Sequence, residues 1–530
     1  MLDGKRFYIF LALYFVILLI PAYWLPLFET TDARYAEISR EMLSSGNFLE
    51  PYYNGIKHFH KPPFAYWMNA LGMGIFGING FGVRFFGSVA AVLIILFTKK
   101  LSFLLTDDKK IADTSVFILS SSVLFLIVSR VVSTDIYLVL FTVMALYYIF
   151  KQIYDVRSMS NALLIGLFLG LGFMAKGPII FLFTLLPLVT AMIFDRAHRR
   201  VFSFSQLLAC IIVFVLVALP WYVYVVGIND GLLNYFLKDQ TVDRVATNKF
   251  SRSKPFYFFF GVFFITFAPW VFYFIRNHKF LNKLKTGKLL YLYVLMPFIV
   301  FQISTSKLGT YLLPFYPVAA LIAAVNADSK IIRTLSSLFL VLLGVAVCAV
   351  PFVIEYTKPY AIFMILFGVA FTGTSLVLIL KGLLKREFVK YFSILLLVAS
   401  LAAFCFVPFI GPYVKGYRLI SEDIKDYNSN KNLNVLLYKA FTPSVSFYLN
   451  DVKPIAFDRE RETQFQKYED YKRFLIQTDD ELDMFISNNK ELLLVSRNNS
   501  HVEFEKRTGY KCVEVSLRGG NKSVSHCKSP

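Results

Sequence analysis

Ionisable residues that border long apolar runs are the positions in this chain where chemistry is first expected. Asp32 and Lys61 lie in one long polar segment, and Asp135 and Lys176 lie in later turns between apolar runs. Charged groups at or beside membrane depth are costly, so each is by default a functional candidate. Lys and Arg bind phosphate groups, whereas a carboxylate can position or deprotonate an acceptor. Together these residue types predict a site that handles a phosphorylated substrate.

Further candidates come from the same polar segments and turns. If the turns converge, they form a pocket in which cations stabilise a departing phosphate while a carboxylate faces the acceptor, as a lipid phosphate-sugar donor requires. The other side of the apolar runs is basic but has no glycine-rich phosphate-binding loop, so the sequence does not indicate a nucleotide donor. The further candidate residues are Arg34, Tyr35, His60, Arg244, Lys307 and Tyr311.

Some of the charged residues also have a purely structural interpretation. The spacing of Glu37, Arg40 and Glu41 predicts i,i+3 and i,i+4 pairs on the surface of a helix. His58 and His60 have the spacing of a weak metal pair, and a divalent metal ion held by His60 with Asp135 stays an open alternative. No other cofactor is predicted.

The composition places the chain in a membrane. Of 530 residues, 57% are hydrophobic and only 17% are charged, and the mean hydropathy is +0.58. The net charge of +20 could suggest nucleic acid, but most Lys and Arg lie in short loops beside apolar runs, where positive charge reports orientation. We therefore expect membrane lipids, and not nucleic acid, as partners.

Apolar runs long enough to cross roughly 30 Å of hydrocarbon recur along the chain. With the N-terminus inside, every inside loop is basic, and an odd number of spans puts the C-terminus outside. The stretch 65–80 is shorter than the bilayer and contains four glycines, so a re-entrant or interfacial helix is expected there. The predicted spans, about thirteen in all, are 7–27, 85–98, 113–128, 136–150, 161–175, 177–194, 204–226, 255–275, 289–303, 308–325, 334–354, 359–380 and 391–410.

Two domains are predicted from a change in composition near residue 411. Residues 1–410 form the transmembrane domain, with two long outer loops at 28–64 and 227–254. Residues 411–530 are rich in charged and amide side chains and predict a small soluble α/β domain.

Short β-rich runs and two cysteines characterise the predicted soluble domain. The runs alternate with a polar, helical segment at 460–488. Cys512 and Cys527 could form a disulfide if the tail faces an oxidising compartment, and two free thiols are the alternative. The predicted strands are Val435–Tyr438, Val445–Tyr448, Leu492–Val495 and Val513–Leu517.

The candidate residues lie in motifs that resemble those of the bacterial lipid A aminoarabinose transferases. That family belongs to the protein O-mannosyltransferase-like group of glycosyltransferases with the GT-C fold. The resemblance extends to about residue 325, with the motifs in order. The matching motifs are Thr31 to Met42 (TDARYAEISREM), His60 to Pro63 (HKPP), Asp135, Ala175 to Gly177 (AKG), Arg244 and Ser306 to Pro314 (SKLGTYLLP).

The resemblance implies an undecaprenyl-phosphate sugar donor, a lipid A acceptor and transfer on the periplasmic face of the bacterial inner membrane. It also implies that Lys61, Arg244 and Tyr311 hold the donor phosphate. Asp32 and Asp135 would face the sugar or the acceptor as the catalytic residues. Arg34, Tyr35, His60, Lys176 and Lys307 would line the rest of the pocket.

Two departures from the family pattern leave the donor sugar open. Thr31 precedes Asp32 where the family has consecutive acids, and His60 precedes Lys61 where the family has Glu. Aminoarabinose, another amino sugar and a hexose all remain candidates. Alternatives of other kinds are a protein or envelope-glycan O-glycosyltransferase, a transporter of a lipid-linked sugar, and a non-catalytic envelope scaffold. The long central runs carry few charges and show no repeat, which disfavours a transporter.

Overall fold

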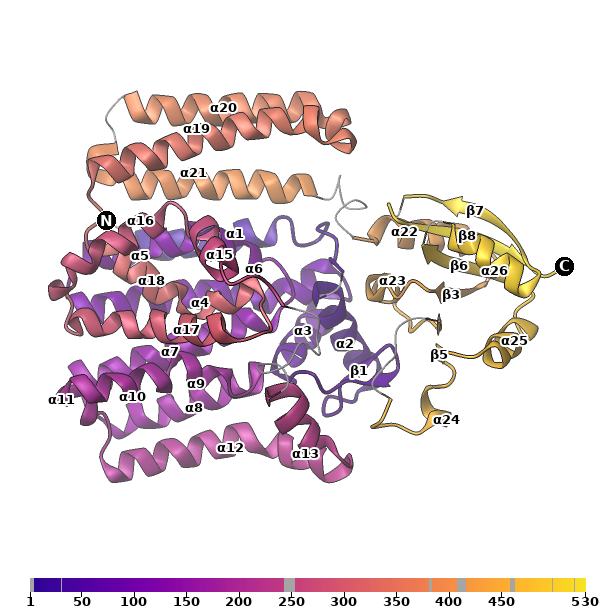
Figure 1. Cartoon of the computed structure of the whole chain (residues 1–530), viewed down its shortest axis with the longest axis horizontal. Coiled ribbons are helices and arrows are strands. Elements are labelled where there is room, and N and C mark those ends of the chain that lie inside the picture. The colour runs from indigo at the N-terminus through magenta and orange to yellow at the C-terminus, as the bar shows by residue number, and fades with distance from the viewer. Residues whose placement is uncertain are drawn as a thin grey trace.

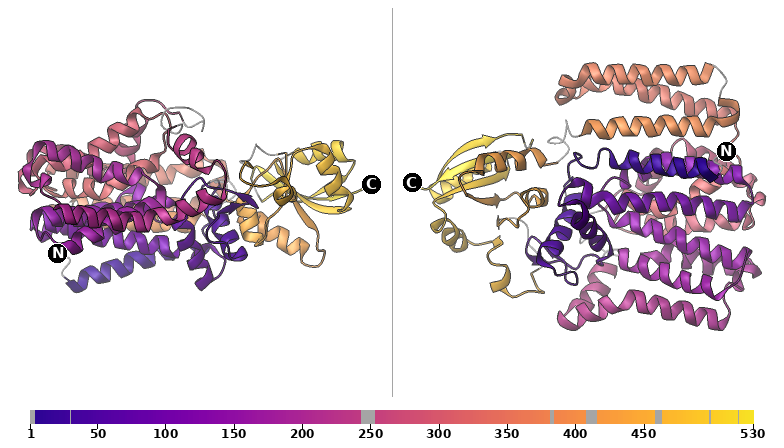
Figure 2. Two further views of the ribbon diagram at one scale, coloured as in Figure 1. Left: turned by 90° about the horizontal axis from the view of Figure 1, so that it is seen from below. Right: turned by 180° about the vertical axis from the view of Figure 1, so that it is seen from behind.

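A bundle of long helices carries a small α/β domain at one end, the domain end (Figure 1). The N-terminus lies at the opposite end of the bundle, here called the basic end (Figure 2). The computed structural model describes residues 4–29, 31–242, 253–380, 384–407, 416–457, 463–497, 499–518 and 520–530. The predicted class, an α-helical polytopic membrane protein with a small C-terminal α/β domain, is confirmed.

The predicted apolar runs coincide with helices or with broken helices. The bundle begins with α1 (Gly4–Leu19), α4 (Gly80–Thr106), α5 (Lys109–Ser121), α6 (Val123–Val128), α7 (Thr134–Tyr154), α8 (Met159–Lys176), α9 (Ile179–Phe183), α10 (Leu185–Phe194), α11 (Arg196–Arg199) and α12 (Phe204–Ile228). They are followed by α13 (Leu232–Asn234), η1 (Tyr235–Val242), α15 (Phe258–Thr266), α16 (Trp270–Arg276), η2 (Asn277–Lys279), η3 (Leu281–Lys283), η4 (Gly287–Tyr291) and α17 (Leu292–Ile303). The bundle ends with η5 (Gly309–Phe315), α18 (Tyr316–Ala324), α19 (Lys330–Val353), η6 (Glu355–Tyr360), α20 (Ala361–Leu380) and α21 (Leu384–Phe406).

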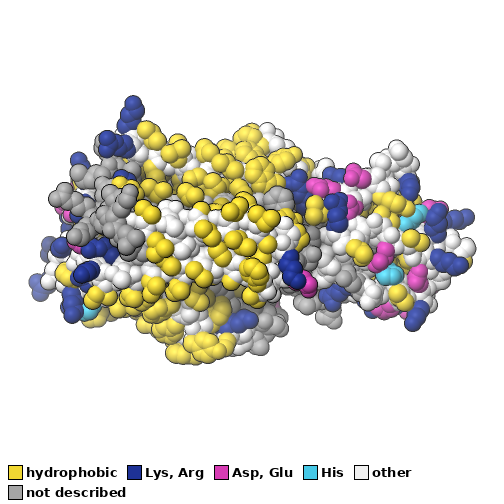
Figure 3. Space-filling view, turned by 90° about the horizontal axis from the view of Figure 1, so that it is seen from above, with side chains coloured by type: hydrophobic (Ala, Val, Ile, Leu, Met, Phe, Trp, Pro, Cys, Tyr) yellow, Lys and Arg dark blue, Asp and Glu magenta, His cyan; other side chains and the backbone are white. Residues whose placement is uncertain are grey.

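Seven helices in the described part of the chain are long and apolar enough to cross a membrane on their own. An eighth span results if α15 and α16 count as one helix, bent by 109° at its break. Other predicted runs form shorter or interrupted helices, so the number of about thirteen stays a prediction. Hydrophobic side chains cover the middle of the bundle, and Lys and Arg gather at its basic end (Figure 3).

The first predicted outer loop is folded at the domain end. It contains α2 (Thr31–Ser45) and a hairpin of β1 (Tyr52–Tyr53) and β2 (Ile56–Lys57). The stretch expected to be a short interfacial helix forms α3 (Phe64–Phe76), which Gly77 ends with a φ of 84°. Asn79 then caps α4 by accepting hydrogen bonds from two backbone N–H groups.

The C-terminal domain is built on one six-stranded sheet with the order β5-β4-β3-β6-β8-β7. β3, β4, β5 and β6 are parallel, whereas β8 pairs antiparallel with β6 and with β7. The strands are β3 (Asn434–Tyr438), β4 (Ile455–Ala456), β5 (Leu475–Ile476), β6 (Glu491–Arg497), β7 (Lys511–Ser516) and β8 (Lys522–Lys528). The helices are α22 (Arg418–Asn428), α23 (Pro443–Leu449), α24 (Tyr468–Tyr471), α25 (Asp479–Ser487) and α26 (Ser500–Thr508).

One predicted strand of this domain is wrong. Residues 445–448 belong to α23, because Pro443 pre-forms its first turn and Asn450, with a φ of 55°, ends it. The segment 460–488, predicted helical, contains β5 between two helices. Strands β4 and β5 are only two residues long, too short for an alternating pattern in the sequence.

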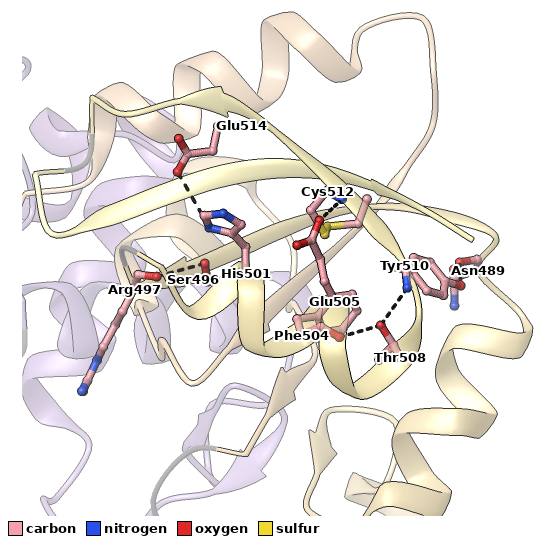
Figure 4. The surroundings of a disulfide bond; sticks show 11 residues. Asn489, Ser496, Arg497, His501, Phe504, Glu505, Thr508, Tyr510, Cys512 and Glu514 are labelled. Atoms are coloured by element: carbon pink, nitrogen blue, oxygen red, sulfur yellow. Dashed lines mark hydrogen bonds and ion pairs between the residues drawn. A yellow bond between two sulfur atoms is a disulfide. The ribbon is translucent and has the colours of Figure 1, made fainter. Parts of the chain in front are cut away.

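Cys512 and Cys527 form a disulfide that joins the paired strands β7 and β8 (Figure 4). Beside it, the carboxylate of Glu505 in α26 accepts a 2.7 Å hydrogen bond from the backbone N–H of Cys512. The sequence left a disulfide and two free thiols as alternatives, and the structure has the disulfide.

The C-terminal domain packs directly on the first outer loop. The backbone N–H of Leu27 donates to the hydroxyl of Tyr448 at 2.9 Å, and the backbone of Phe28 forms a bridge with Gly416. The side chain of Gln466 bonds the hairpin on both sides of Ile56. The boundary proposed near residue 411 lies outside the described residues, and the division into two domains stays a proposal.

Candidate active site

Asp135 lies in the first turn of α7 at the domain end, where its carboxylate is held by two neighbours. Ser133 caps the helix, because its hydroxyl accepts a hydrogen bond from the backbone N–H of Asp135 and donates one to Oδ2 at 2.9 Å. The other oxygen, Oδ1, forms an ion pair with Nζ of Lys176. The Asp135 side chain is 11% exposed, so it is largely buried but still accessible.

Lys176 connects Asp135 to a third predicted residue. It is the last residue of α8, which ends because Gly177 adopts a φ of 78°. Its ammonium lies 5.1 Å from the ring centroid of Tyr311 in η5. An ammonium over an aromatic face is attracted by the ring quadrupole. Three candidates from distant parts of the sequence, Asp135, Lys176 and Tyr311, thus form one cluster.

Asp32 is buried at the start of α2 and has different partners. Its Oδ2 accepts from the backbone N–H of Phe28 at 3.0 Å and forms an ion pair with Arg84 at 2.9 Å. Its Oδ1 accepts from the backbone N–H of Val132 at 2.6 Å. The side chain is 4% exposed. The predicted catalytic carboxylate is therefore engaged on both oxygens.

Lys61 and His60 precede α3 and lie against the site from the side of the first outer loop. Lys61 is half-buried, and three residues later the ring of Phe64 packs on Tyr137 of α7, with centroids 5.5 Å apart. The start of α3 is thereby brought to the first turns of α7, where Asp135 lies. The His60 ring packs on that of His58 at 3.9 Å. Arg244, the third predicted phosphate ligand, lies outside the described residues.

The remaining candidates have mainly local contacts. The ammonium of Lys307 donates to the carbonyls of Gln302 and Ser304 at 3.2 and 2.7 Å, so it neutralises the C-terminal end of α17. The guanidinium of Arg34 lies 5.4 Å from the ring centroid of Tyr35 on the same helix. The structure therefore does not place these three residues in the cluster around Asp135.

Glu37, Arg40 and Glu41 are buried, so their predicted position on a helix surface is wrong. Arg40 forms two hydrogen bonds with Glu37, at 2.7 and 2.8 Å, and the i,i+3 pairing itself is confirmed. Glu41 accepts hydrogen bonds from the backbone N–H groups of Asn54 and Gly55 in the hairpin turn. Burial and the nearby charge of Glu37 raise the pKa of Glu41 to about 8. The hairpin and α23 of the C-terminal domain pack on α2. The local sequence pattern does not reveal this packing.

Known proteins resemble this chain in sequence and in fold. Residues 6–227 match the model of the family described as dolichyl-phosphate-mannose-protein mannosyltransferase. The undecaprenyl phosphate-alpha-4-amino-4-deoxy-L-arabinose arabinosyl transferase of Edwardsiella ictaluri is 32% identical over 56% of this chain and 55% of its own length. The aligned segment thus spans about half of that relative. An uncharacterized protein of Aquifex aeolicus is 28% identical over 83% of this chain and 85% of its own length.

A solved structure decides the fold. The crystal structure of ArnT from Cupriavidus metallidurans bound to undecaprenyl phosphate aligns with a TM-score of 0.83, covering 99% of this chain and 98% of that chain at 19% identity. The chain has the ArnT fold. The resemblance seen in the motifs is confirmed by these relatives, and the fold they share extends through the C-terminal domain.

Within the ArnT fold, the described residues contain no group of three or more His, Cys, Asp or Glu side chains arranged to hold a metal ion. The suggested ligands have other partners, since Asp135 is engaged by Ser133 and Lys176 while His60 packs on His58.

Two functional candidates of this ArnT-fold chain escaped the sequence analysis. Arg84 lies immediately before a predicted span and pairs with Asp32 inside the protein. Ser133 caps α7 and donates to the carboxylate of Asp135. A signal for Arg84 existed, because an unpaired charge next to an apolar run requires a partner. For Ser133 the signal was its place just before the first turn of a helix, where serine commonly caps.

Proposed function

We propose that this protein is a membrane glycosyltransferase that moves a sugar from undecaprenyl phosphate to an acceptor. The observation that carries the proposal is the cluster of Asp135, Lys176 and Tyr311 at the domain end of the ArnT fold. A cation beside a carboxylate at the edge of an apolar bundle suits a substrate with a lipid tail and a charged phosphate head. Lys61, three residues before α3, adds a second cation near the first turns of α7.

The reaction is a displacement at the anomeric carbon of the sugar. An acceptor oxygen forms a bond with that carbon while the bond from the carbon to the phosphate oxygen breaks, and undecaprenyl phosphate leaves with the bonding electrons. Lys61, Arg244 and Tyr311 bind the phosphate, and Lys176 stabilises the charge that grows on it. Asp135 faces the acceptor and receives its proton if the acceptor oxygen is a hydroxyl.

The site is proposed to face the periplasm of a bacterial inner membrane. The basic loops lie at the opposite end of the bundle, which the positive-inside rule assigns to the cytoplasm. The disulfide between Cys512 and Cys527 is typical of an oxidising compartment and supports the same orientation of the C-terminal domain.

Lipid A of lipopolysaccharide is the proposed acceptor, and aminoarabinose, another amino sugar or a hexose the proposed donor sugar. The names of the arabinosyl transferases that the chain resembles favour aminoarabinose. The two departures near Asp32 and Lys61 leave room for another sugar. An acceptor on a protein or on another envelope glycan is the alternative.

Mass spectrometry of lipid A tests the proposal directly. Lipid A is compared between cells with the gene, cells without it, and deletion cells complemented with the wild type, Lys61→Ala or Lys151→Ala. Lys151 lies in the last turn of α7, at the basic end, and serves as the control. A sugar-sized mass that is lost on deletion and returns with the wild type and Lys151→Ala, but not with Lys61→Ala, supports the proposal. Unchanged lipid A moves the acceptor to another envelope molecule.

One further assay distinguishes a transporter from a transferase. Purified protein in detergent has no second compartment, so only a transferase converts a lipid-linked sugar and an acceptor into a new product there. If product forms and its formation requires Asp135, the protein is not merely a transporter. If the folded protein forms no product, the transferase proposal is contradicted.

A further inference from the structure

Arg84 binds the segment between α1 and α2. It lies in the first turns of α4, buried, and its guanidinium donates to the backbone carbonyls of Ala22 and Leu25 at 3.1 and 2.8 Å. It also donates to the carbonyl of Pro26 at 3.0 Å and to Asp32 at 2.9 Å. One buried cation thus holds both the segment after α1 and the start of α2. A charge this deep needs such partners, because desolvation is costly.

The close approach of this segment to α4 is built into the backbone. A Cβ atom on Gly80, the first residue of α4, would lie 2.6 Å from the carbonyl oxygen of Ala22 and 3.0 Å from the guanidinium of Arg84. Only glycine leaves that space. The contact between Arg84 and the segment 22–26 is therefore a packed feature of the fold.

Asp32 links Arg84 to the turn before α7. Its Oδ2 is bound by Arg84, and its Oδ1 accepts the 2.6 Å hydrogen bond from the backbone N–H of Val132. The next residue, Ser133, donates to Asp135 Oδ2 at 2.9 Å, and Asp135 pairs with Lys176. A continuous path of polar contacts thus joins Arg84 to the cluster proposed to do the chemistry.

The geometry of Asp32 argues against direct contact with a substrate. Three donors already bind its two oxygens, and the side chain is 4% exposed. The Asp135 carboxylate is bound by two side chains and is 11% exposed. A general base must reach the proton that it removes, and of the two carboxylates Asp135 is the more accessible.

We propose that Asp32 and Arg84 are positioning residues for the proposed transfer reaction: together they fix the turn at Val132 and Ser133 and so orient the carboxylate of Asp135. The expected effect on turnover rests on the proposed function, whereas the expected effect on the turn at Val132 and Ser133 does not. Misplacing a reacting group by about 1 Å can reduce a rate roughly 100-fold. The pair therefore controls turnover without touching the sugar or the phosphate.

The kinetic test compares Asp32→Asn, Asp32→Glu, Arg84→Lys and Ser133→Ala in the full-length protein. We expect kcat to fall roughly 10- to 100-fold in Asp32→Asn, whereas the dissociation constant for undecaprenyl phosphate stays within about twofold of the wild type, because no phosphate ligand changes. In Asp32→Asn combined with Ser133→Ala, the loss should match the larger single loss, since both act through Asp135. Losses that multiply would mean that Asp32 contacts the substrate, and would overturn the proposal.

A second measurement does not depend on activity. Hydrogen–deuterium exchange of the amides at 131–136 should become faster in Asp32→Asn and in Arg84→Lys, because the turn loses its anchor. The matched control is Asp113→Asn. Asp113 of α5 is also buried, and it pairs at 2.8 Å with Lys99, which lies in α4, the helix of Arg84, towards the basic end. It should leave exchange at 131–136 unchanged.

The outcomes separate this proposal from the proposed function. Unchanged exchange at 131–136 in both anchor variants would overturn the positioning role, whatever the enzyme does. Faster exchange in a protein that transfers no sugar would uphold the anchor and contradict the transferase. If Arg84→Lys fails to fold, Asp32→Asn, which keeps the shape of the side chain, still decides the question.

Discussion

The ammonium of Lys176, at the end of α8, forms an ion pair with the carboxylate of Asp135, at the start of α7. The helices α7 and α8 are antiparallel neighbours. The first turn of α7 and the last residue of α8 therefore meet at the same end of the bundle. Each residue is buried enough to need a partner, and each retains access to the site. The pair can therefore hold a cation and a carboxylate in fixed relative positions before any substrate binds.

Asp135→Asn and Lys176→Met should each reduce sugar transfer by roughly 100-fold or more, because each removes a charge aimed at a developing charge. The rate of product formation is measured in detergent with an undecaprenyl-phosphate sugar. Asp155→Asn, an exposed aspartate at the far end of α7, is the control and should keep the wild-type rate. Wild-type turnover in Asp135→Asn would remove this residue from the mechanism.

Lys61→Ala should weaken binding of undecaprenyl phosphate roughly tenfold or more, because a charged hydrogen bond to phosphate contributes about 1.5–3 kcal/mol. Tyr311→Phe should weaken it less, by about threefold to tenfold, since only a neutral hydroxyl is removed. Titration of the purified protein with undecaprenyl phosphate gives both values. Equal affinity in Lys61→Ala and the wild type would show that the lysine binds something else.

Docking of the C-terminal domain should depend on pH through Glu29. Burial raises the pKa of Glu29 to about 7, partly offset by hydrogen bonds from the backbone N–H and hydroxyl of Ser444 and by the charge of Lys522. Between the ordinary glutamate value of 4.5 and about 7, the docked state binds more protons than the undocked state. Docking is therefore favoured at low pH and weakens as pH rises through this window, by at most about 1.4 kcal/mol per pH unit.

This pH dependence is measured by amide exchange of α23 in the full-length protein between about pH 5 and 8, after correction for the intrinsic exchange rate. Glu29→Gln keeps an acceptor for Ser444 without the charge, so α23 should be equally protected across the range. A wild-type protein whose α23 protection is flat over the same range would refute the role of Glu29.

Gly55→Ala should separate the hairpin from the C-terminal domain. A Cβ atom there would lie 2.2 Å from the ring of Phe474, and the backbone φ of +75° adds strain for any residue but glycine. We expect a loss of about 1–3 kcal/mol of stability from overpacking. Gly46→Ala is the matched control, because Gly46 has a φ of +70° and open space around it. Thermal unfolding that is equal in the two variants would show that backbone strain, and not packing, decides the effect.

The sequence by itself determined the membrane class, the helical runs and the polar turns that carry Asp135, Lys176 and Tyr311. These follow from local properties: apolar length for the helices, and the cost of burying a charge for the candidates. The end of α8 is a local feature too, because Gly177 follows Lys176 and adopts a φ of 78°.

Only the tertiary structure decided which charges meet. Asp32 and Asp135 looked equivalent in the sequence, yet Asp32 is sealed by Arg84 from α4 and the backbone of Val132, whereas Asp135 faces Lys176. Likewise, Glu41 was expected on a surface, but it is buried and the hairpin turn binds its carboxylate. These differences arise from contacts between segments 13 to 100 residues apart, and no local pattern records how such segments pack.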